Sequence, residues 1–73
     1  MSGRPRKHSL TLRGHRTSVS LEDSFWVELQ RLAEVEGTSV NELIARIDAA
    51  RGVSSGLASA IRVHVLEAIK DGQ

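Results

Sequence analysis

The 73-residue sequence contains no cysteine, no tyrosine and a single proline. Without cysteine, a disulfide framework and a thiolate metal site are both excluded. No apolar run approaches the length of a membrane span, and the N-terminal residues lead into no signal-peptide core. These absences favour a soluble cytoplasmic protein.

Aromatic residues are also scarce, because Phe25 and Trp26 supply the whole aromatic content. A chain this short buries little apolar surface alone and usually needs a metal, disulfides or a partner chain. At helical spacing beside Leu29, Trp26 is more typical of a core residue than of a ligand-binding one. We therefore expect one small domain that depends on a partner chain.

Charge is distributed unevenly, although the formal net charge is only +1. The first 16 residues carry five basic and no acidic side chains, whereas the remainder carries five basic and nine acidic ones. A basic segment of this kind usually contacts a polyanion. The alternative is a solvated tail that only aids solubility.

The segment Arg16–Leu21 alternates between polar and apolar residues, as a half-buried strand does. Thr17, Val19 and Leu21 share one face of this strand, and Arg16, Ser18 and Ser20 share the other. With no tight hairpin signal in the chain, the predicted partner is a copy of the same strand across a two-fold axis. Residues 9–12 alternate weakly, which leaves a short extra strand open.

Three helical patterns follow the strand. The first runs from the polar group at residues 22–24 to about Glu36 and ends at Gly37. The second begins at Ser39, which forms a capping box with Glu42, and ends near Arg51. The predicted organisation is a flexible basic arm at residues 1–15, a core at residues 16–52 and a C-terminal helix at residues 53–73.

The apolar residues of the strand and of the first two helices follow the periods of these elements. In a dimer these residues form the shared core. The predicted dimer core consists of Val19, Leu21, Phe25, Trp26, Leu29, Leu32, Leu43, Ile44 and Ile47.

The order strand, helix, turn with a glycine, helix resembles the ribbon-helix-helix family of DNA-binding proteins over residues 16–51. The stretch His15–Asp23 with Phe25-Trp26, followed later by Ala58–Val63, further resembles a compact bacterial subfamily with a basic N-terminal arm and a third helix. The resemblance implies a mainly α-helical protein with one short β-strand. Its expected assembly is an intertwined homodimer with a two-stranded antiparallel ribbon.

The resemblance also implies that the ribbon enters the major groove of double-stranded DNA, with Arg16, Ser18 and Ser20 contacting bases. Arginine can bond guanine O6 and N7 together, and serine hydroxyls can donate or accept. Phosphates are assigned to the basic arm and to the exposed amides at the start of the second helix. The predicted phosphate contacts are Arg4, Arg6, Lys7, Arg13, Ser39, Val40 and Asn41.

Metal and catalytic sites are not expected, and neither is a cofactor. His8, His15 and His64 lack the spacing and the companion ligands of a metal site. Asp23 and Ser24 near His15 are hydrolytic residue types, but so short a chain is a poor enzyme scaffold.

Two functions of different classes follow from these patterns. The first is a nucleoid-associated transcriptional regulator, a repressor that occupies its operator as a homodimer or a higher assembly. The second is a protein-interaction module, such as an antitoxin or adaptor, that binds a protein partner through the C-terminal helix. A salt titration on DNA distinguishes the two.

Overall fold

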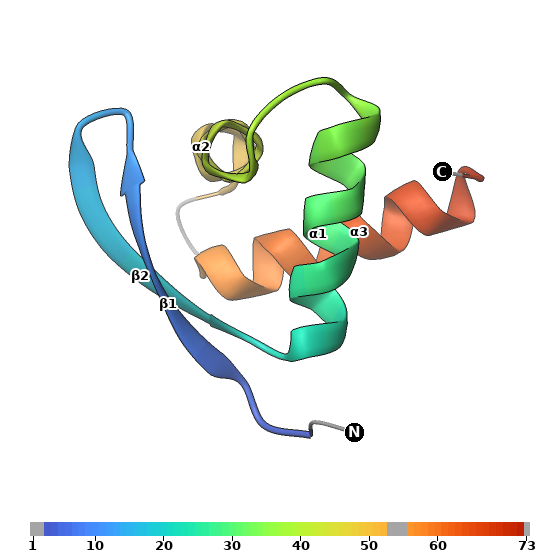
Figure 1. Ribbon diagram of the computed structural model, residues 1–73, viewed down its shortest axis with the longest axis horizontal. Helices are drawn as coiled ribbons and strands as arrows, with labels where there is room; N and C mark the ends of the chain where they lie inside the picture. The colour runs from blue at the N-terminus through green and yellow to red at the C-terminus, as the bar shows by residue number, and fades with distance from the viewer. Residues whose placement is uncertain (1–2, 53–55, 73) are drawn as a thin grey trace.

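The computed structural model describes residues 3–52 and 56–72, which form a β-hairpin followed by three helices (Figure 1). The elements are β1 Arg6–Leu12, β2 His15–Leu21, α1 Asp23–Val35, α2 Val40–Ala50 and α3 Leu57–Lys70. Across this described part of the chain, no helix is both long enough and apolar enough to cross a membrane.

The hairpin is closed by a two-residue turn, because Leu12 pairs with His15 and the register continues to Arg6 opposite Leu21. Both turn residues have positive φ, 50° at Arg13 and 89° at Gly14. Positive φ at both central positions is the feature of a type I′ turn, whose twist matches that of the flanking strands. Glycine adopts this conformation without a steric cost.

The prediction of a single strand is therefore wrong, because β2 pairs along one edge with β1 of the same chain and does not need a copy of itself as its first partner. The turn Arg13-Gly14 lacks the Asn-Gly or Asp-Gly signature of most two-residue hairpins, so the sequence pattern did not indicate it. Residues 6–12, expected to belong to a flexible arm, form a strand longer than the extra strand left open at residues 9–12.

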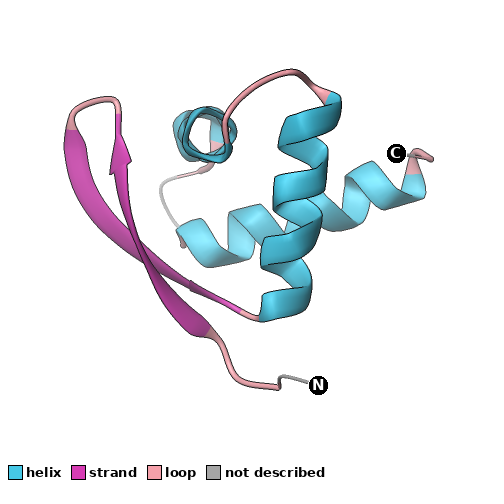
Figure 2. Cartoon of the chain, in the orientation of Figure 1, coloured by secondary structure: helices cyan, strands magenta, loops and turns pink. Residues whose placement is uncertain are grey.

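One face of the hairpin packs against the helices (Figure 2). Leu10 and Leu12 of β1 and Val19 and Leu21 of β2 point to this face and are buried. They join the buried faces of all three helices in one cluster. The helical members of this core are Leu29, Leu32, Ala33, Leu43, Ile44, Ala45, Ile47, Ile61 and Val65.

Most of the residues assigned to a dimer core are thus buried within one chain. Leu21, Leu29, Leu32 and Ile44 have no exposed surface left for a second copy to cover. Within one chain, β1 supplies a layer of this core that the sequence pattern had attributed to a partner.

Phe25 and Trp26, also assigned to the dimer core, are half-buried and pack against the edge of the single-chain core. The Trp26 ring stacks on the His8 ring of β1, with centroids 3.7 Å apart and planes within 7°. Offset or parallel ring contacts of this kind add to the stability that burial provides. The pair therefore attaches β1 to the first turn of α1.

Helix α1 begins after Glu22 and ends before Gly37, whose φ of 70° allows Gly37 and Thr38 to donate backbone hydrogen bonds to the last turn. The predicted stop at Gly37 is confirmed. The predicted side-chain cap at the start is not, because the Glu22 side chain accepts no hydrogen bond from a backbone amide of the first turn. The Glu22 carboxylate instead accepts hydrogen bonds from α3.

The Glu22 carboxylate accepts two hydrogen bonds from the Arg62 guanidinium of α3, at 3.0 Å from Nε and 2.8 Å from Nη2. The same guanidinium lies 5.7 Å from the centre of the Phe25 ring, a cation–π contact. Both nitrogens donate to the same oxygen, Oε1, and only the planar guanidinium of arginine combines two such donors with a ring contact. Arg62 therefore fastens α3 to the junction between β2 and α1.

We expect Glu22→Gln to lower the stability of the protein at neutral pH. A hydrogen bond from its own backbone and the hydrogen bond from Arg62 lower the pKa of the Glu22 carboxyl below its ordinary 4.5. A lowered folded-state pKa stabilises the fold above pH 4.5, and this contribution is lost as pH falls toward the folded-state value. Urea unfolding at several pH values measures the difference between wild type and variant.

That difference should be largest at neutral pH and should shrink below pH 4.5. Glu34→Gln is the control, because it removes a carboxylate from the exposed side of the same helix. Equal effects of the two substitutions at neutral pH would contradict the role assigned to Glu22.

Candidate nucleic-acid interface

The face of the hairpin that points away from the helices carries only polar side chains. Arg16, Ser18 and Ser20, the predicted base contacts, are all exposed on this face of β2. Their partners across the antiparallel pair are Thr11, Ser9 and Lys7, in the same order. Directly opposed residues share one face of a sheet, so six side chains from one chain form this outer face.

Ser9 and Thr11 were not predicted as site residues. The weak alternation Ser9-Leu10-Thr11-Leu12 was the one signal for them in the sequence. It places these two side chains on the face of the strand that Leu10 and Leu12 do not occupy. Both side chains are exposed and both leucines are buried, as this alternation requires.

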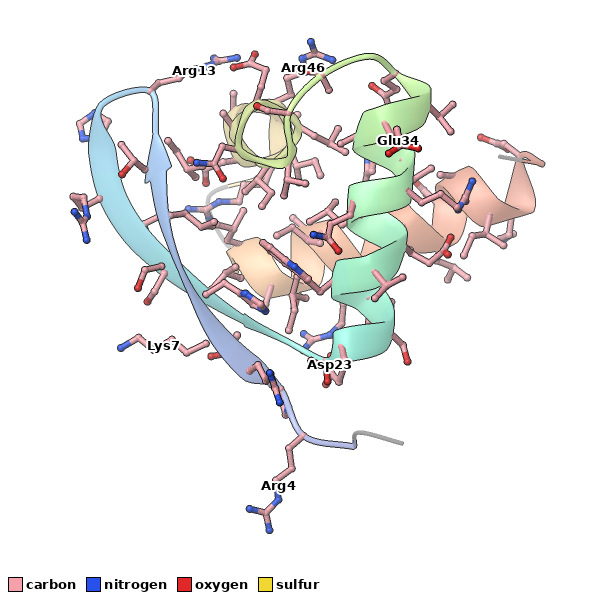
Figure 3. The ribbon with its side chains drawn as sticks, viewed as in Figure 1. Arg4, Lys7, Arg13, Asp23, Glu34 and Arg46 are labelled. Atoms are coloured by element: carbon pink, nitrogen blue, oxygen red, sulfur yellow. The ribbon has the colours of Figure 1, made fainter. Side chains whose placement is uncertain are left out.

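The basic side chains of the arm take different directions. Lys7 belongs to the outer face and projects away from the helices (Figure 3). Arg6 lies on the inner face, where its Nε is 3.6 Å from the Asp23 carboxylate. Arg4 lies beyond the start of β1, at the N-terminal end of the hairpin (Figure 3).

At the other end of the hairpin, Arg13 contacts the start of α2. Its Nη2 lies 3.1 Å from Glu42 Oε2, and Arg46 approaches the same oxygen at 3.5 Å (Figure 3). Arg46 also reaches the Glu36 carboxylate at 3.4 Å, after the end of α1. This ion-pair network connects the hairpin turn to two helices.

The start of α2 has the predicted N-cap. Ser39 Oγ accepts a hydrogen bond from the Glu42 backbone amide at 3.0 Å. In a complete capping box the Glu42 side chain would return to Ser39, but here it pairs with Arg13 and Arg46. The Val40 side chain packs against the core, so Val40 can offer a ligand only its backbone amide.

Asn41 Nδ2 donates a 3.4 Å hydrogen bond to the Thr11 carbonyl oxygen. The structure therefore brings Arg13 of the hairpin close to three predicted phosphate contacts that lie far from it in the sequence, namely Ser39, Val40 and Asn41 at the start of α2. A guanidinium beside the positive end of a helix favours an anion. Exposed ion pairs such as Arg13–Glu42 contribute little to stability, so a phosphate can compete with the carboxylate.

Thr17 was predicted to face the core with Val19 and Leu21, yet it is exposed. It shares the inner face of the hairpin with Leu10 but lines a groove of about 320 Å³ between β2, the end of α2 and the start of α3. Thr17 and His15 therefore mark the part of the inner face that the helices leave uncovered.

The three histidines lie in different surroundings. His8 stacks on Trp26, His15 lines the groove beside Thr17, and His64 lies on α3. Within residues 3–52 and 56–72, no three His, Cys, Asp or Glu side chains come close enough together to hold a metal ion.

Two comparisons with known proteins found a match, one with a family model and one with a solved structure. A family model described as a ribbon-helix-helix domain matches residues 5–69. The fold is similar to the solved structure of an uncharacterized protein from Bordetella pertussis Tohama I, with a TM-score of 0.77 and 34% sequence identity. The match covers 90% of this chain but 56% of that one, so the chain spans little more than half of the Bordetella protein. No curated protein matches the sequence.

We expect Ser39→Ala to destabilise the protein by about 1 kcal/mol, because the substitution removes the side-chain acceptor of the Glu42 amide. Ser24→Ala is the matched control, because Ser24 is exposed in the first turn of α1 and does not occupy the N-cap position. Urea unfolding of both variants checks the expectation. Identical midpoints for wild type and Ser39→Ala would contradict the capping role.

Proposed function

Because this chain belongs to the ribbon-helix-helix family of DNA-binding regulators, we propose that it is a sequence-selective transcriptional regulator that represses by occupying its operator. The proposed ligand is double-stranded DNA, and the proposed binding surface is the outer face of the hairpin in its major groove. A two-stranded ribbon fits this groove.

The observation that carries this proposal is the composition of the outer face. Its six exposed side chains comprise two cations and four hydroxyl groups, with no carboxylate and no apolar residue. Phosphates attract the cations, and hydroxyls can donate to or accept from base edges. Such a face needs no rearrangement of the core in order to approach DNA.

Arg16 is the proposed main determinant of sequence preference on this face. A guanidinium can bond O6 and N7 of one guanine together, which discriminates against other bases by about 1–3 kcal/mol. Ser18 and Ser20 are short and bond less selectively, so their role is to let the backbone approach the bases. The long side chain of Arg16 can therefore extend to a base edge that its shorter neighbours on β2 do not reach.

The cluster formed by Arg13 and the start of α2 is the proposed phosphate-binding site beside the ribbon. It lies at the turn end of the hairpin, whereas Arg4, Arg6 and Lys7 lie at the opposite end. Contacts to phosphates at both ends would fix the position of the hairpin along the groove. Such contacts also make the affinity depend strongly on salt concentration.

A homodimer remains part of the proposal, through a surface other than the buried core. Within the described residues each strand has one hydrogen-bonded neighbour, so β2 has an edge that is not paired with another strand. Unpaired edges favour the addition of another strand. Pairing of two β2 edges across a two-fold axis would place four strands in one sheet with both copies of Arg16 near its centre.

One observation favours the second candidate function, a protein-interaction module of the antitoxin or adaptor type. Helix α3 exposes three large apolar side chains, Val63, Leu66 and Ile69, each about half accessible to solvent. Exposed apolar side chains on one helix are a feature of protein-binding surfaces. On a DNA-bound regulator the same surface would pair dimers or hold a protein partner.

We expect Arg16→Ala to weaken binding to a generic DNA duplex at low salt. Because the proposed homodimer carries two copies of Arg16, the loss of both cations should also reduce the slope of log affinity against log salt by up to about two. Fluorescence anisotropy with a labelled duplex, titrated at several salt concentrations, measures both quantities.

Lys70→Ala is the matched control, because it removes one positive charge at the far end of α3 (Figure 1). This variant should keep the affinity and the slope of the wild type. Equal losses in the two variants would show that net charge alone drives binding. Absence of wild-type binding at low salt would refute the DNA-binding proposal and favour the protein-interaction module.

A further inference from the structure

We propose that the Glu42 carboxylate is a built-in competitor of the DNA phosphate, and that Arg46 is a second cation of the phosphate site that Glu42 occupies. This inference rests on the proposed DNA-binding function and adds to it a contact that lowers the affinity. In the free protein Glu42 holds two guanidinium groups, and a phosphate has to displace it.

The Glu42 carboxylate lies between two arginines from different elements. Its Oε2 atom is 3.1 Å from Arg13 Nη2 of the hairpin turn and 3.5 Å from Arg46 Nε, one helical turn further along α2. Both guanidinium groups therefore converge on one anionic oxygen, and an oxygen of a phosphate can take the same contacts. The carboxylate marks the position that the phosphate would occupy.

The formal charges of this cluster cancel in the free protein. Arg46 also pairs with the Glu36 carboxylate at 3.4 Å, so two cations face two carboxylates. A phosphate is attracted by the summed charge of such a group, which is zero while Glu42 stays in place. The cluster therefore gains a net positive charge for DNA only when Glu42 withdraws.

The displaced carboxylate has another partner at the start of α2. Ser39 Oγ already accepts the hydrogen bond from the Glu42 amide, which is one half of a capping box. In the other half, the side chain of the third helical residue accepts a hydrogen bond from the backbone amide of the N-cap residue. The Glu42 side chain is 41% exposed, so no core packing opposes its rotation toward Ser39.

The backbone conformation of Arg13 supports a role for its side chain. Arg13 has a φ of 50°, in the left-handed region, where a two-residue turn favours Gly, Asn or Asp. Its ion pair with Glu42 is exposed, and exposed pairs contribute little to stability. A phosphate site gives an arginine at this position a function that the ion pair alone does not supply.

The strengths of the competing contacts decide which anion is bound in the complex. Exposed ion pairs are screened by water and salt, so they hold their partners weakly. A phosphate that replaces the carboxylate keeps contacts with both guanidinium groups and releases counterions from the DNA. DNA therefore displaces Glu42, at an affinity reduced by the fraction of molecules in which Glu42 covers the site.

The test is fluorescence anisotropy with a labelled DNA duplex at one low salt concentration, with wild type and Glu42→Gln. Glutamine removes the charge and can still complete the capping box, which accepts either residue. We expect Glu42→Gln to bind the duplex about 2- to 10-fold more tightly, the worth of the exposed ion pairs that no longer have to break. Glu34→Gln, on the exposed side of α1, is the matched control for net charge and should keep the wild-type affinity.

The double variant Arg13→Asn/Arg46→Gln establishes whether Glu42 acts through these two arginines. Asparagine suits the positive φ of the turn and glutamine suits a helix, so the substitutions are compatible with the fold. The outer face of the hairpin is unchanged in this variant, so binding at low salt should persist. Adding Glu42→Gln to it should leave the affinity unchanged, and far-ultraviolet circular dichroism establishes that each variant is folded.

Unchanged or weaker binding by Glu42→Gln, with measurable binding by the wild type, would overturn the competition and leave the proposed function intact. An equal gain in Glu34→Gln, or the same gain from Glu42→Gln in the double variant, would also overturn it, because general repulsion would then explain the effect. Absence of wild-type binding at low salt would instead refute DNA binding itself.

Discussion

The pairing of β1 with β2 inside one chain is the constraint on which the rest of the structure depends. The turn at Arg13 and Gly14 returns the chain so that four strand residues, Leu10, Leu12, Val19 and Leu21, reach the same side. A single strand would offer two of these side chains and leave its backbone groups unpaired. With both strands present, a chain of 73 residues forms a core that all three helices share.

The same pairing determines the surface available for function. Because side chains alternate along a strand, burial of the leucines on one face leaves the polar residues of both strands on the other. Contacts from each helix then fix the hairpin in place: Trp26 of α1 stacks on His8, Asn41 of α2 bonds to Thr11, and Arg62 of α3 holds Glu22. The proposed DNA-binding face is therefore supported by contacts from all three helices, although it lies at the edge of a small protein.

Local sequence signals predicted the helical half of the fold well. The spacing of Leu29 and Leu32, the stop at Gly37 and the cap at Ser39 depend on residues within a few positions of one another, and the structure has all of them. Alternation likewise placed Val19 and Leu21 inward and Arg16 outward. Each of these features is decided by short-range geometry, which a sequence shows directly.

Features that depend on distant residues were not predictable in the same way. The hairpin turn uses an arginine at positive φ, a conformation that few non-glycine residues adopt, so its sequence carries little signal. Glu22 looked like a capping residue, but Arg62, 40 positions away, takes its carboxylate. Ser9 and Thr11 joined the candidate site only once the register placed them beside Ser18 and Arg16.

The most direct test of the central claim, that the outer face of the hairpin is the DNA-binding surface, is a titration of the ¹⁵N-labelled protein with a DNA duplex at low salt. Amide chemical shifts report which residues contact the duplex. The account predicts the largest changes at Ser9, Thr11, Arg16 and Ser18, with further changes at the start of α2. Changes confined to the exposed side of α3 around Leu66, with none in the hairpin, would contradict it.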